Sequence, residues 1–339
     1  HPNMVVEIAR RLGWSNLSVR VGLAADMAAR HAMMAKSAAT SKAYGAILPS
    51  GHSLPATSLD YYDDTTLTTF DGTVLHCSEI TESQVGDLNL SVEVTGRPSH
   101  AVVLDRTLFY PEGGGQLGDQ GRLVNGSTVN VVDTRIEGGV VLHLTDGPVE
   151  GQVTGHLNEE RRAQLMDHHT AVHIVGGSAR AVLGPHIWQA GSNKGERYAR
   201  LDVTHYQRLN RNDLDAIEDH ANDVIAQNPT VEKLVLSRAE ADERFGFTLY
   251  QGGPPKHQQI RVIKIGEHDI QACGGTHHDQ TVEVGELRII RSSAVQDGVE
   301  RLQIVAGETA REHARRQERL LTDSSDVLGV QPDDLPKAV

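Results

Sequence analysis

Two short stretches, far apart in the chain, hold the residues best suited to bind a metal. In "DHHTAVHIVGG" (167–177), His169 and His173 are four positions apart, which places both on one face of a helix. In "QACGGTHHD" (271–279), Cys273 and His277 have the same spacing, but the two glycines between them favour a turn. Three imidazoles and one thiolate suit Zn²⁺ in tetrahedral geometry. The sequence therefore predicts one zinc site built from His169, His173, Cys273 and His277.

The role of this zinc stays open at the level of sequence. Either pair alone could arise by chance in a chain with 18 histidines. The metalloprotease motif HExxH requires a glutamate directly after the first histidine, and Thr170 stands there instead. Four protein ligands close a structural site, whereas a catalytic zinc keeps an open position. His168, His186 and His278 are expected outside the ligand set, and Cys77 is expected in a core.

A glycine-rich stretch, "TLFYPEGGGQLGDQG" (107–121), is the second feature that could serve chemistry. Three successive glycines allow the backbone to approach a ligand closely or to adopt positive φ. A phosphate-binding loop would need Lys-Ser/Thr after the glycines, and none follows. The stretch is either a hairpin turn or part of a pocket. In a pocket, Gln116 would be the side chain that forms hydrogen bonds.

The elements around these motifs predict a multi-domain α+β protein. The pattern indicates a long helix that ends at Gly184-Pro185, a helix over 212–227, and strands in "VEKLVLSR", "IRVIKI", "DIQACGG", "ELRIIRSS" and "ERLQIVAG". Short β-branched runs separated by turn residues indicate a small barrel before the long helix. The expected parts are helices over 1–47, a linker over 48–60, the barrel over 61–155, an α+β domain over 156–306, and a polar helical region over 307–339.

The composition restricts the class of protein. With 38% hydrophobic and 23% charged residues among 339, the chain is typical of soluble globular proteins. No apolar run approaches the roughly 18 residues of a membrane span, and no secretory signal is visible. Two cysteines are too few for a disulfide framework, which favours the cytoplasm. The chain does not begin with Met, so we expect a piece of a longer protein.

The formal net charge of −13 argues against non-specific binding to nucleic acid, including DNA. An RNA partner would need a local basic surface. "SNKGERYAR" and "YQRLNR" supply the best candidates, and the alternative is a solvated charged face. The candidate residues are Lys194, Arg197, Arg200, Arg208 and Arg211.

These motifs, taken in order and spacing, resemble the editing region of the alanyl-tRNA synthetases, and most closely the archaeal type. The resemblance rests on "FYPEGGGQLGDQG", "HHTAVH", "WQAGSNKG", "RLDVTHY" and "QACGGTHHDQTVEVGELRI". It covers nearly the whole chain. By this resemblance the N-terminal helices end a tRNA-recognition domain, the barrel carries the glycine motif, and residues 156–306 form the editing domain shared with threonyl-tRNA synthetase. The last residues begin a C-terminal helical region.

The resemblance implies an activity and a partner. One zinc per chain would sit on the four predicted ligands and serve the hydrolysis of Ser-tRNA(Ala) and Gly-tRNA(Ala), either by activating water or by positioning the substrate. The acceptor end of tRNA(Ala) would be the partner. The editing pocket would include Gln116, Gln189, Thr170, Gly114 and Gly115, with Thr170 a candidate contact to the serine hydroxyl.

The resemblance also implies further domains in a parent enzyme, beyond the residues of this chain. The parent enzyme attaches alanine to tRNA(Ala) with ATP and Mg²⁺, and no domain for that reaction is visible in these residues. Ligase activity is not expected from them alone. A homodimer would form only through a C-terminal module that is also missing. A membrane location is not expected.

Four alternatives remain. A free-standing trans-editing deacylase would share the barrel and core but would not need residues 1–47 or the last helix. The editing domain of threonyl-tRNA synthetase lacks the glycine-motif barrel. A zinc lyase or hydrolase for small molecules leaves the glycine motif and the fourth ligand unexplained. A zinc-stapled RNA-binding module without activity would unfold when its metal is removed, with no distinct activity lost.

Overall fold

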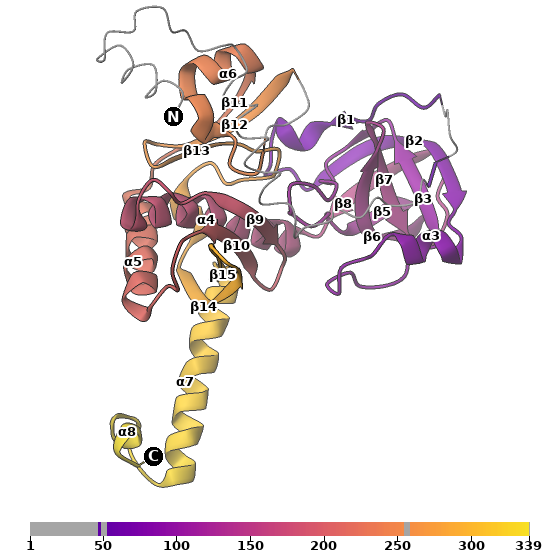
Figure 1. The fold of residues 1–339 in the computed structure, drawn as a ribbon. Coiled ribbons are helices and arrows are strands. Elements are labelled where there is room, and N and C mark those ends of the chain that lie inside the picture. Colours follow the sequence, from indigo (N-terminus) through magenta and orange to yellow (C-terminus); the bar gives the residue numbers. More distant parts are fainter. Residues whose placement is uncertain (1–46, 49–52, 254–257, 339) are drawn as a thin grey trace, which may run out of the picture.

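The computed structural model describes residues 47–48, 53–253 and 258–338. They form a β-barrel, an α+β unit beside it, and a long helix that projects away from the α+β unit (Figure 1). The helices predicted over 1–47 fall outside the described residues, apart from residue 47. The mixed α and β character with a barrel, predicted from the sequence, is confirmed.

The barrel closes through six antiparallel strands in the order β2-β3-β7-β6-β5-β8. A tight turn at Gly138 and Gly139, both with positive φ, joins β6 to β7, as expected for a two-residue hairpin with glycine in it. Cys77 packs against the barrel core, as predicted. The strands are β2 (Thr69–Glu79), β3 (His100–Leu104), β5 (Gly121–Asn125), β6 (Ser127–Glu137), β7 (Val140–Thr145) and β8 (Gln152–Leu157).

Part of the segment predicted as a linker is built into the barrel. Leu48 is buried in the barrel's second apolar cluster. The short strand β1 (Ser58–Leu59) pairs in parallel with β4 (Arg106–Thr107), and a 3-10 helix, Asp60–Tyr62, follows it. The linker predicted over 48–60 stays a prediction, and backbone hydrogen bonding holds its second half against the barrel. A short helix, α3 (Glu82–Asp87), lies between β2 and β3.

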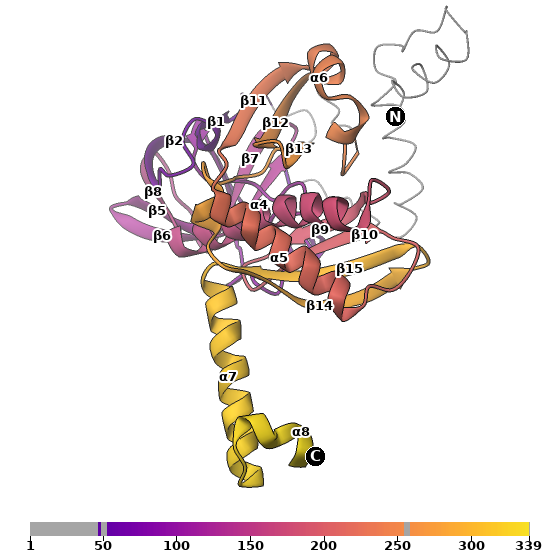
Figure 2. The same cartoon turned by 90° about the vertical axis from the view of Figure 1, so that its left-hand side faces the viewer.

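Two helices cover one face of a four-stranded sheet in the α+β unit (Figure 2). The helix α4 (Glu159–Leu183) begins at the N-cap Asn158, has two acidic residues in its first turn, and ends at Gly184, where φ is +118°. The helix α5 (Arg211–Gln227) begins with a capping box at Asn210 and ends at Asn228 in the left-handed conformation. Both predicted helices are confirmed, and the structure adds the N-caps that begin them.

The strands of the α+β unit form two sheets. One sheet has the order β14-β15-β10-β9 and the other β11-β12-β13. The predicted strands are present, and β9 and β10 are added by the structure from stretches whose glycines and polar residues hid them. The bounds are β9 (Gln189–Lys194), β10 (Ala199–Thr204), β11 (Val231–Ser237), β12 (Gln259–Ile265), β13 (Asp269–Ala272), β14 (Leu287–Gln296) and β15 (Val299–Ala306).

Shorter helices complete the described residues. The helix α6 (Arg238–Phe245) is capped by the Ser237 side chain, which accepts from the Glu240 N–H. The polar helix α7 (Glu308–Leu328) leads away from the sheet to α8 (Leu335–Ala338). No helix within the described residues is long and apolar enough to cross a membrane. The barrel strands run from residue 69 to 157, and the α+β elements run from 159 to 306. The division of the chain into domains at residues 60, 155 and 306 stays a prediction.

Candidate metal centre

The four predicted ligands converge on one point. His169 and His173 lie on α4, while Cys273 and His277 lie on the turn that follows β13. One ligand atom of each residue lies within 4.8 Å of all the others. The Cys273 sulfur is 3.3 Å from Nε2 of His169 and 3.4 Å from Nε2 of His277. Two ligands of one tetrahedral zinc are separated by roughly 3.5 Å at ordinary bond lengths, so the donor set fits this ion.

The outward nitrogen of each histidine has its own partner. Nδ1 of His169 donates to Oε1 of Gln116 at 2.7 Å, and Nδ1 of His173 donates to the Asp269 carboxylate at 3.2 Å. Nδ1 of His277 lies 3.3 Å from the Thr170 hydroxyl. A hydrogen bond at Nδ1 fixes the tautomer that leaves Nε2 free to bind a metal. The three histidines therefore present Nε2 to the common point.

Electrostatics divide the cluster into two kinds of group. Burial lowers the pKa of His169 and of His277 well below the usual value, and nearby cations lower both further, so these imidazoles are neutral. Burial also lowers the pKa of His173, but hydrogen bonds to Asp269 and Cys273 outweigh it and raise the pKa to about 9. Burial raises the pKa of Cys273, yet the bond to His173 outweighs it and lowers the pKa to about 7. A metal ion would displace the shared proton.

The glycine-rich stretch reaches from the barrel into the metal cluster. Oε1 of Gln116 accepts from Nδ1 of His169 and from the Thr276 backbone N–H at 3.0 Å, and Nε2 of Gln116 donates to the Thr276 hydroxyl at 2.9 Å. Gln116 is fully buried. One barrel side chain thus ties α4 to the turn that carries the other two ligands.

The glycines are needed where this loop meets β9. The Gly115 backbone has φ +80°, and a Cβ there would lie 2.3 Å from the Ser192 carbonyl oxygen. The Lys194 N–H donates to the Gly115 carbonyl at 2.6 Å, and Nζ of Lys194 donates to the Gly114 carbonyl at 2.7 Å. The pairing of Gln116 with Lys194 places "GGGQ" directly beside "QAGSNK". Gly113 and Gln116 also close a tight turn, as the hairpin alternative predicts, while the pocket alternative stays a prediction.

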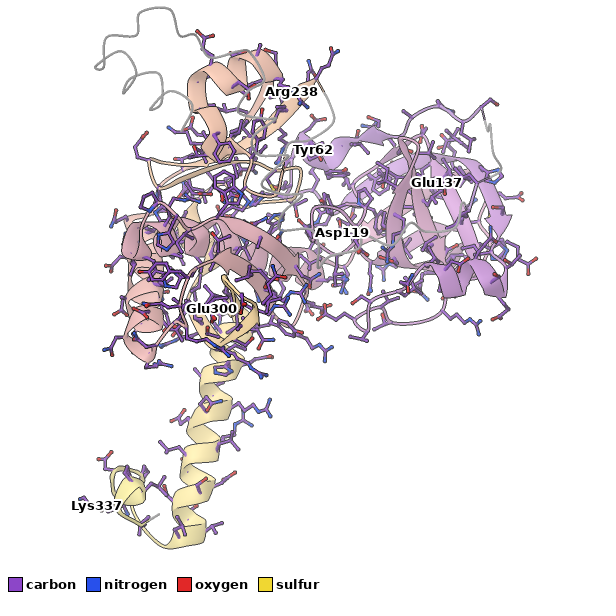
Figure 3. The ribbon with its side chains drawn as sticks, viewed as in Figure 1. Tyr62, Asp119, Glu137, Arg238, Glu300 and Lys337 are labelled. Atoms are coloured by element: carbon purple, nitrogen blue, oxygen red, sulfur yellow. The ribbon has the colours of Figure 1, made fainter. Side chains whose placement is uncertain are left out.

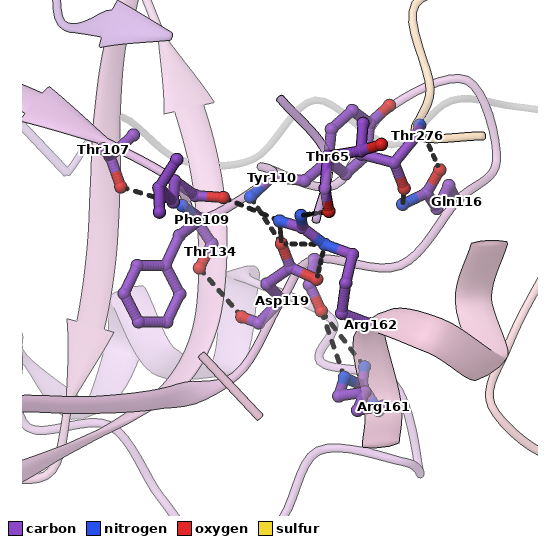
Figure 4. Close-up of polar contacts among 12 residues, drawn as sticks. Thr65, Thr107, Phe109, Tyr110, Gln116, Asp119, Thr134, Arg161, Arg162 and Thr276 are labelled. Atoms are coloured by element: carbon purple, nitrogen blue, oxygen red, sulfur yellow. Dashed lines mark hydrogen bonds and ion pairs between the residues drawn. The ribbon is translucent and has the colours of Figure 1, made fainter. Parts of the chain in front are cut away.

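A buried ion pair locks the same loop onto α4 (Figure 4). The Asp119 carboxylate accepts from Nε and Nη2 of Arg162, and both side chains are almost fully buried. Nη2 of Arg162 also donates to the Leu108 carbonyl at 2.6 Å, and the Tyr110 N–H donates to Asp119 at 2.7 Å. Arg161 donates to the Gly118 carbonyl. Asp119 and Tyr62 both lie where the barrel meets the α+β unit, whereas Glu137 lies within the barrel (Figure 3).

The remaining predicted pocket residues have other surroundings. The buried Thr170 hydroxyl accepts from the His278 backbone N–H and bonds to Nδ1 of His277. It therefore contacts His277 on the nitrogen that does not face the shared metal point. The half-buried Gln189 lies on β9, and its N–H donates to Gln251. His168, His186 and His278 lie outside the ligand set, as predicted, with partners that include Gly195, His205 and Asp167 respectively.

The prediction that Lys194 belongs to a basic surface is wrong. That side chain is 2% exposed, because the glycine loop covers its ammonium, and burial lowers its pKa to about 8. Arg197 and Arg208 are exposed and face Glu93 and Glu300. Arg211 is exposed and pairs with Asp215. Arg200 lies half-buried on β10. Three of the five predicted residues thus face a carboxylate, and a fourth is buried.

A cavity of about 510 Å³ opens beside Cys273. It is lined by the face of the β11-β12-β13 sheet that carries Lys233, Val235 and Arg261, and by Tyr62. Sequence reasoning missed Asp269, Arg261 and Tyr62. Asp269 precedes Cys273 by four positions in "DIQACGG", but nothing in its own stretch indicates a bond to His173, which lies 96 residues away.

Two parts of the chain match known protein families. Residues 15–161 match the family of tRNA synthetases class II (A), and residues 260–303 match the Threonyl and Alanyl tRNA synthetase second additional domain. An alanine–tRNA ligase of Haloquadratum walsbyi is 44% identical over 287 residues, which is 84% of this chain and 29% of that protein. The corresponding ligase of Methanothrix thermoacetophila is 45% identical over 257 residues, 75% of this chain and 28% of that protein. That of Archaeoglobus fulgidus is 41% identical over 289 residues.

Proposed function

We propose that this chain, which corresponds to a region of the alanine–tRNA ligases, is the part that hydrolyses wrongly charged Ser-tRNA(Ala) and Gly-tRNA(Ala). The chain spans less than a third of the length of the curated relatives it matches. Attachment of alanine with ATP and Mg²⁺ is therefore assigned to the rest of such an enzyme. The acceptor end of tRNA(Ala) is the proposed partner, and the cytoplasm is the proposed location.

The observation that carries this proposal is the oriented set of four ligands, two of which, Cys273 and His277, lie in the residues that match the second additional domain. A bound zinc supplies Lewis acidity, either to a water molecule or to the substrate amino acid. The small-molecule lyase alternative does not account for the fourth ligand or for Gln116, which bonds to His169. A purely structural zinc has less need of a cavity that opens on Cys273.

The protein's own groups would hold the site and admit the substrate. Gln116 and Thr170 orient His169 and His277, so we assign both to the support of the ligands rather than to contact with the serine hydroxyl. Lys233 and Arg261 bring positive charge to the cavity, where a negatively charged RNA end would enter. Asp63 and Asp279 moderate that charge, since Asp279 pairs with Lys233. An ester placed against Cys273 would be within reach of the metal centre.

The deciding experiment compares the release of serine from Ser-tRNA(Ala) with the release of alanine from Ala-tRNA(Ala). A site that hydrogen-bonds the serine hydroxyl rejects the analogue that lacks it by a factor of about 10⁴ in favourable cases. We expect fast loss of serine, with alanine spared. Equal rates for the two esters, or hydrolysis of neither by a zinc-loaded protein, would reject editing and favour a zinc-stapled RNA-binding module.

A pair of valine variants locates the substrate. Val235 is 65% exposed in the cavity, and Val282 is 52% exposed outside it. The bulky change Val235→Trp should raise KM for Ser-tRNA(Ala) severalfold, because it fills part of the cavity, while bound zinc stays unchanged. Val282→Trp serves as the matched control and should have little effect. An unchanged KM in Val235→Trp would exclude entry through this cavity.

A further inference from the structure

The turn over residues 273–277 carries two of the four ligands but has little regular structure to hold it. The strand β13 ends at Ala272, and two glycines follow Cys273. Glycine leaves the backbone its greatest conformational freedom. We propose that Tyr62 and Arg261 form a clamp on this turn, and that they are positioning residues for the Cys273 sulfur.

Three consecutive carbonyl groups of the turn are held by the clamp. Nη1 of Arg261 donates to the carbonyl oxygens of Cys273, at 3.0 Å, and of Gly275, at 2.8 Å. The Tyr62 hydroxyl donates to the carbonyl oxygen between them, that of Gly274, at 2.7 Å. One guanidinium group and one phenol hydroxyl thus hold all three carbonyl groups. With its carbonyls fixed, the turn can direct the Cys273 side chain inward.

The two clamp residues also hold each other. The Arg261 guanidinium lies over the Tyr62 ring, 4.9 Å from its centroid, in a cation–π contact. Arg261 lies on β12 directly beside the turn, and its backbone carbonyl accepts from the Cys273 N–H at 3.0 Å. The clamp therefore holds Cys273 through both the backbone and the side chain of Arg261.

The clamp is anchored on the barrel side. Tyr62 ends the 3-10 helix Asp60–Tyr62, and its ring packs 4.5 Å from the buried Tyr61. Tyr61 in turn lies edge-on to Tyr110, whose chain continues into the glycine-rich loop. Gln116 holds the next residue of the turn, Thr276, from the same side. The barrel thus supports the ligand turn at two separate points, so the metal site is built jointly by the two units.

The test measures metal binding rather than catalysis. The inference rests on the metal site of the proposed function, but it does not need the deacylation activity. Tyr62→Phe keeps the ring, its packing against Tyr61 and the cation–π contact, and removes only the hydroxyl. Because the loss of a group that orients a ligand costs about 10–100-fold in metal affinity, we expect zinc transfer to a chelator to be about 10-fold faster than in the parent protein.

Arg261 variants and a thiol measurement extend the test. Arg261→Met should exceed the effect of Tyr62→Phe, and Arg261→Lys should restore part of the loss because it keeps a donor. In metal-free protein carrying Cys77→Ser, which leaves Cys273 as the single thiol of the chain, both clamp variants should label faster at Cys273. Cobalt-loaded variants should show a changed sulfur-to-cobalt absorption band. Tyr206→Phe is the control, since Tyr206 is exposed and contacts His186 and His205 instead.

The possible results distinguish failure of the clamp proposal from failure of the metal site itself. Parent-like chelation, labelling and cobalt spectra in both Tyr62→Phe and Arg261→Met would overturn the clamp while leaving the metal site standing. A parent protein that binds neither zinc nor cobalt would overturn the site and the clamp with it. If Arg261→Met fails to fold by circular dichroism, Tyr62→Phe alone decides.

Discussion

His143 of the barrel and the clustered histidines of the α+β unit are buried in contrasting ways. In the described part of the barrel, the fully buried His143 has both nitrogens engaged by neutral groups, the Thr107 hydroxyl at 2.8 Å and the Val102 carbonyl at 3.0 Å. In the α+β unit, each clustered histidine has one nitrogen bonded outward and directs the other to a shared point. Two neutral partners hold a buried histidine as a structural residue, whereas several histidines that direct one nitrogen each to a shared point can bind a metal.

The contrast is sharpest when a ligand is removed. His169→Ala or Cys273→Ala should abolish stoichiometric zinc and, with it, release of serine from Ser-tRNA(Ala). Because structural zinc contributes about 10–16 kcal/mol in small peptides, the α+β unit should also lose much of its stability. His143→Gln is the matched control and should keep its zinc. Metal analysis and deacylation on the same samples check this, and intact activity in Cys273→Ala would sink the metal centre.

The contact between the two units can be broken at Asp119. Asp119→Asn leaves Arg162 buried without its full counter-charge, which costs about 3–5 kcal/mol of unfolding free energy when a buried pair is broken. Arg162→Met should cost a similar amount. The double variant should cost clearly less than the sum, because no charge is then left alone. Urea unfolding of all four proteins measures the coupling, and simple additivity would contradict a direct ion pair.

The barrel should respond to pH through His143. Burial lowers the pKa of His143 to about 4, below the 6.5 of the unfolded chain. The unfolded state therefore binds more protons between these values, so the stabilisation is complete above pH 6.5 and is lost as pH falls through 4. The loss amounts to roughly 3 kcal/mol. Hydrogen exchange of residues 140–145 should show it, and His143→Gln should flatten the profile, whereas His313→Gln on α7 should not.

The smallest expected effect separates two neighbouring glycines. Gly115→Ala places a methyl group 2.3 Å from the Ser192 carbonyl and should push the loop from β9, at a cost of about 2–3 kcal/mol. Gly114→Ala meets no atom within 4 Å, and only its φ of +57° is unfavourable, so about 1 kcal/mol is expected. Thermal unfolding compares the two. Equal costs would mean that the close approach to β9 is not maintained in solution.

The sequence predicts what is local and misses what is long-range. The helix α4 and its ligand pair follow from caps and spacing, and the turn at 273–277 follows from its glycines. Asp119 with Arg162, and Tyr62 with Gly274, join residues 43 and 212 positions apart, so no local pattern could pair them. Lys194 shows the same limit, because a loop from the barrel buries a side chain that its own stretch presents as surface.

The most direct test of the central claim measures bound zinc and serine release together. The parent protein is assayed as isolated, after removal of metal by a chelator, and after zinc is restored. We predict about one zinc per chain, release of serine that falls with the zinc, and recovery of both on reloading. Serine release that continues at full rate in metal-free, folded protein would contradict the account.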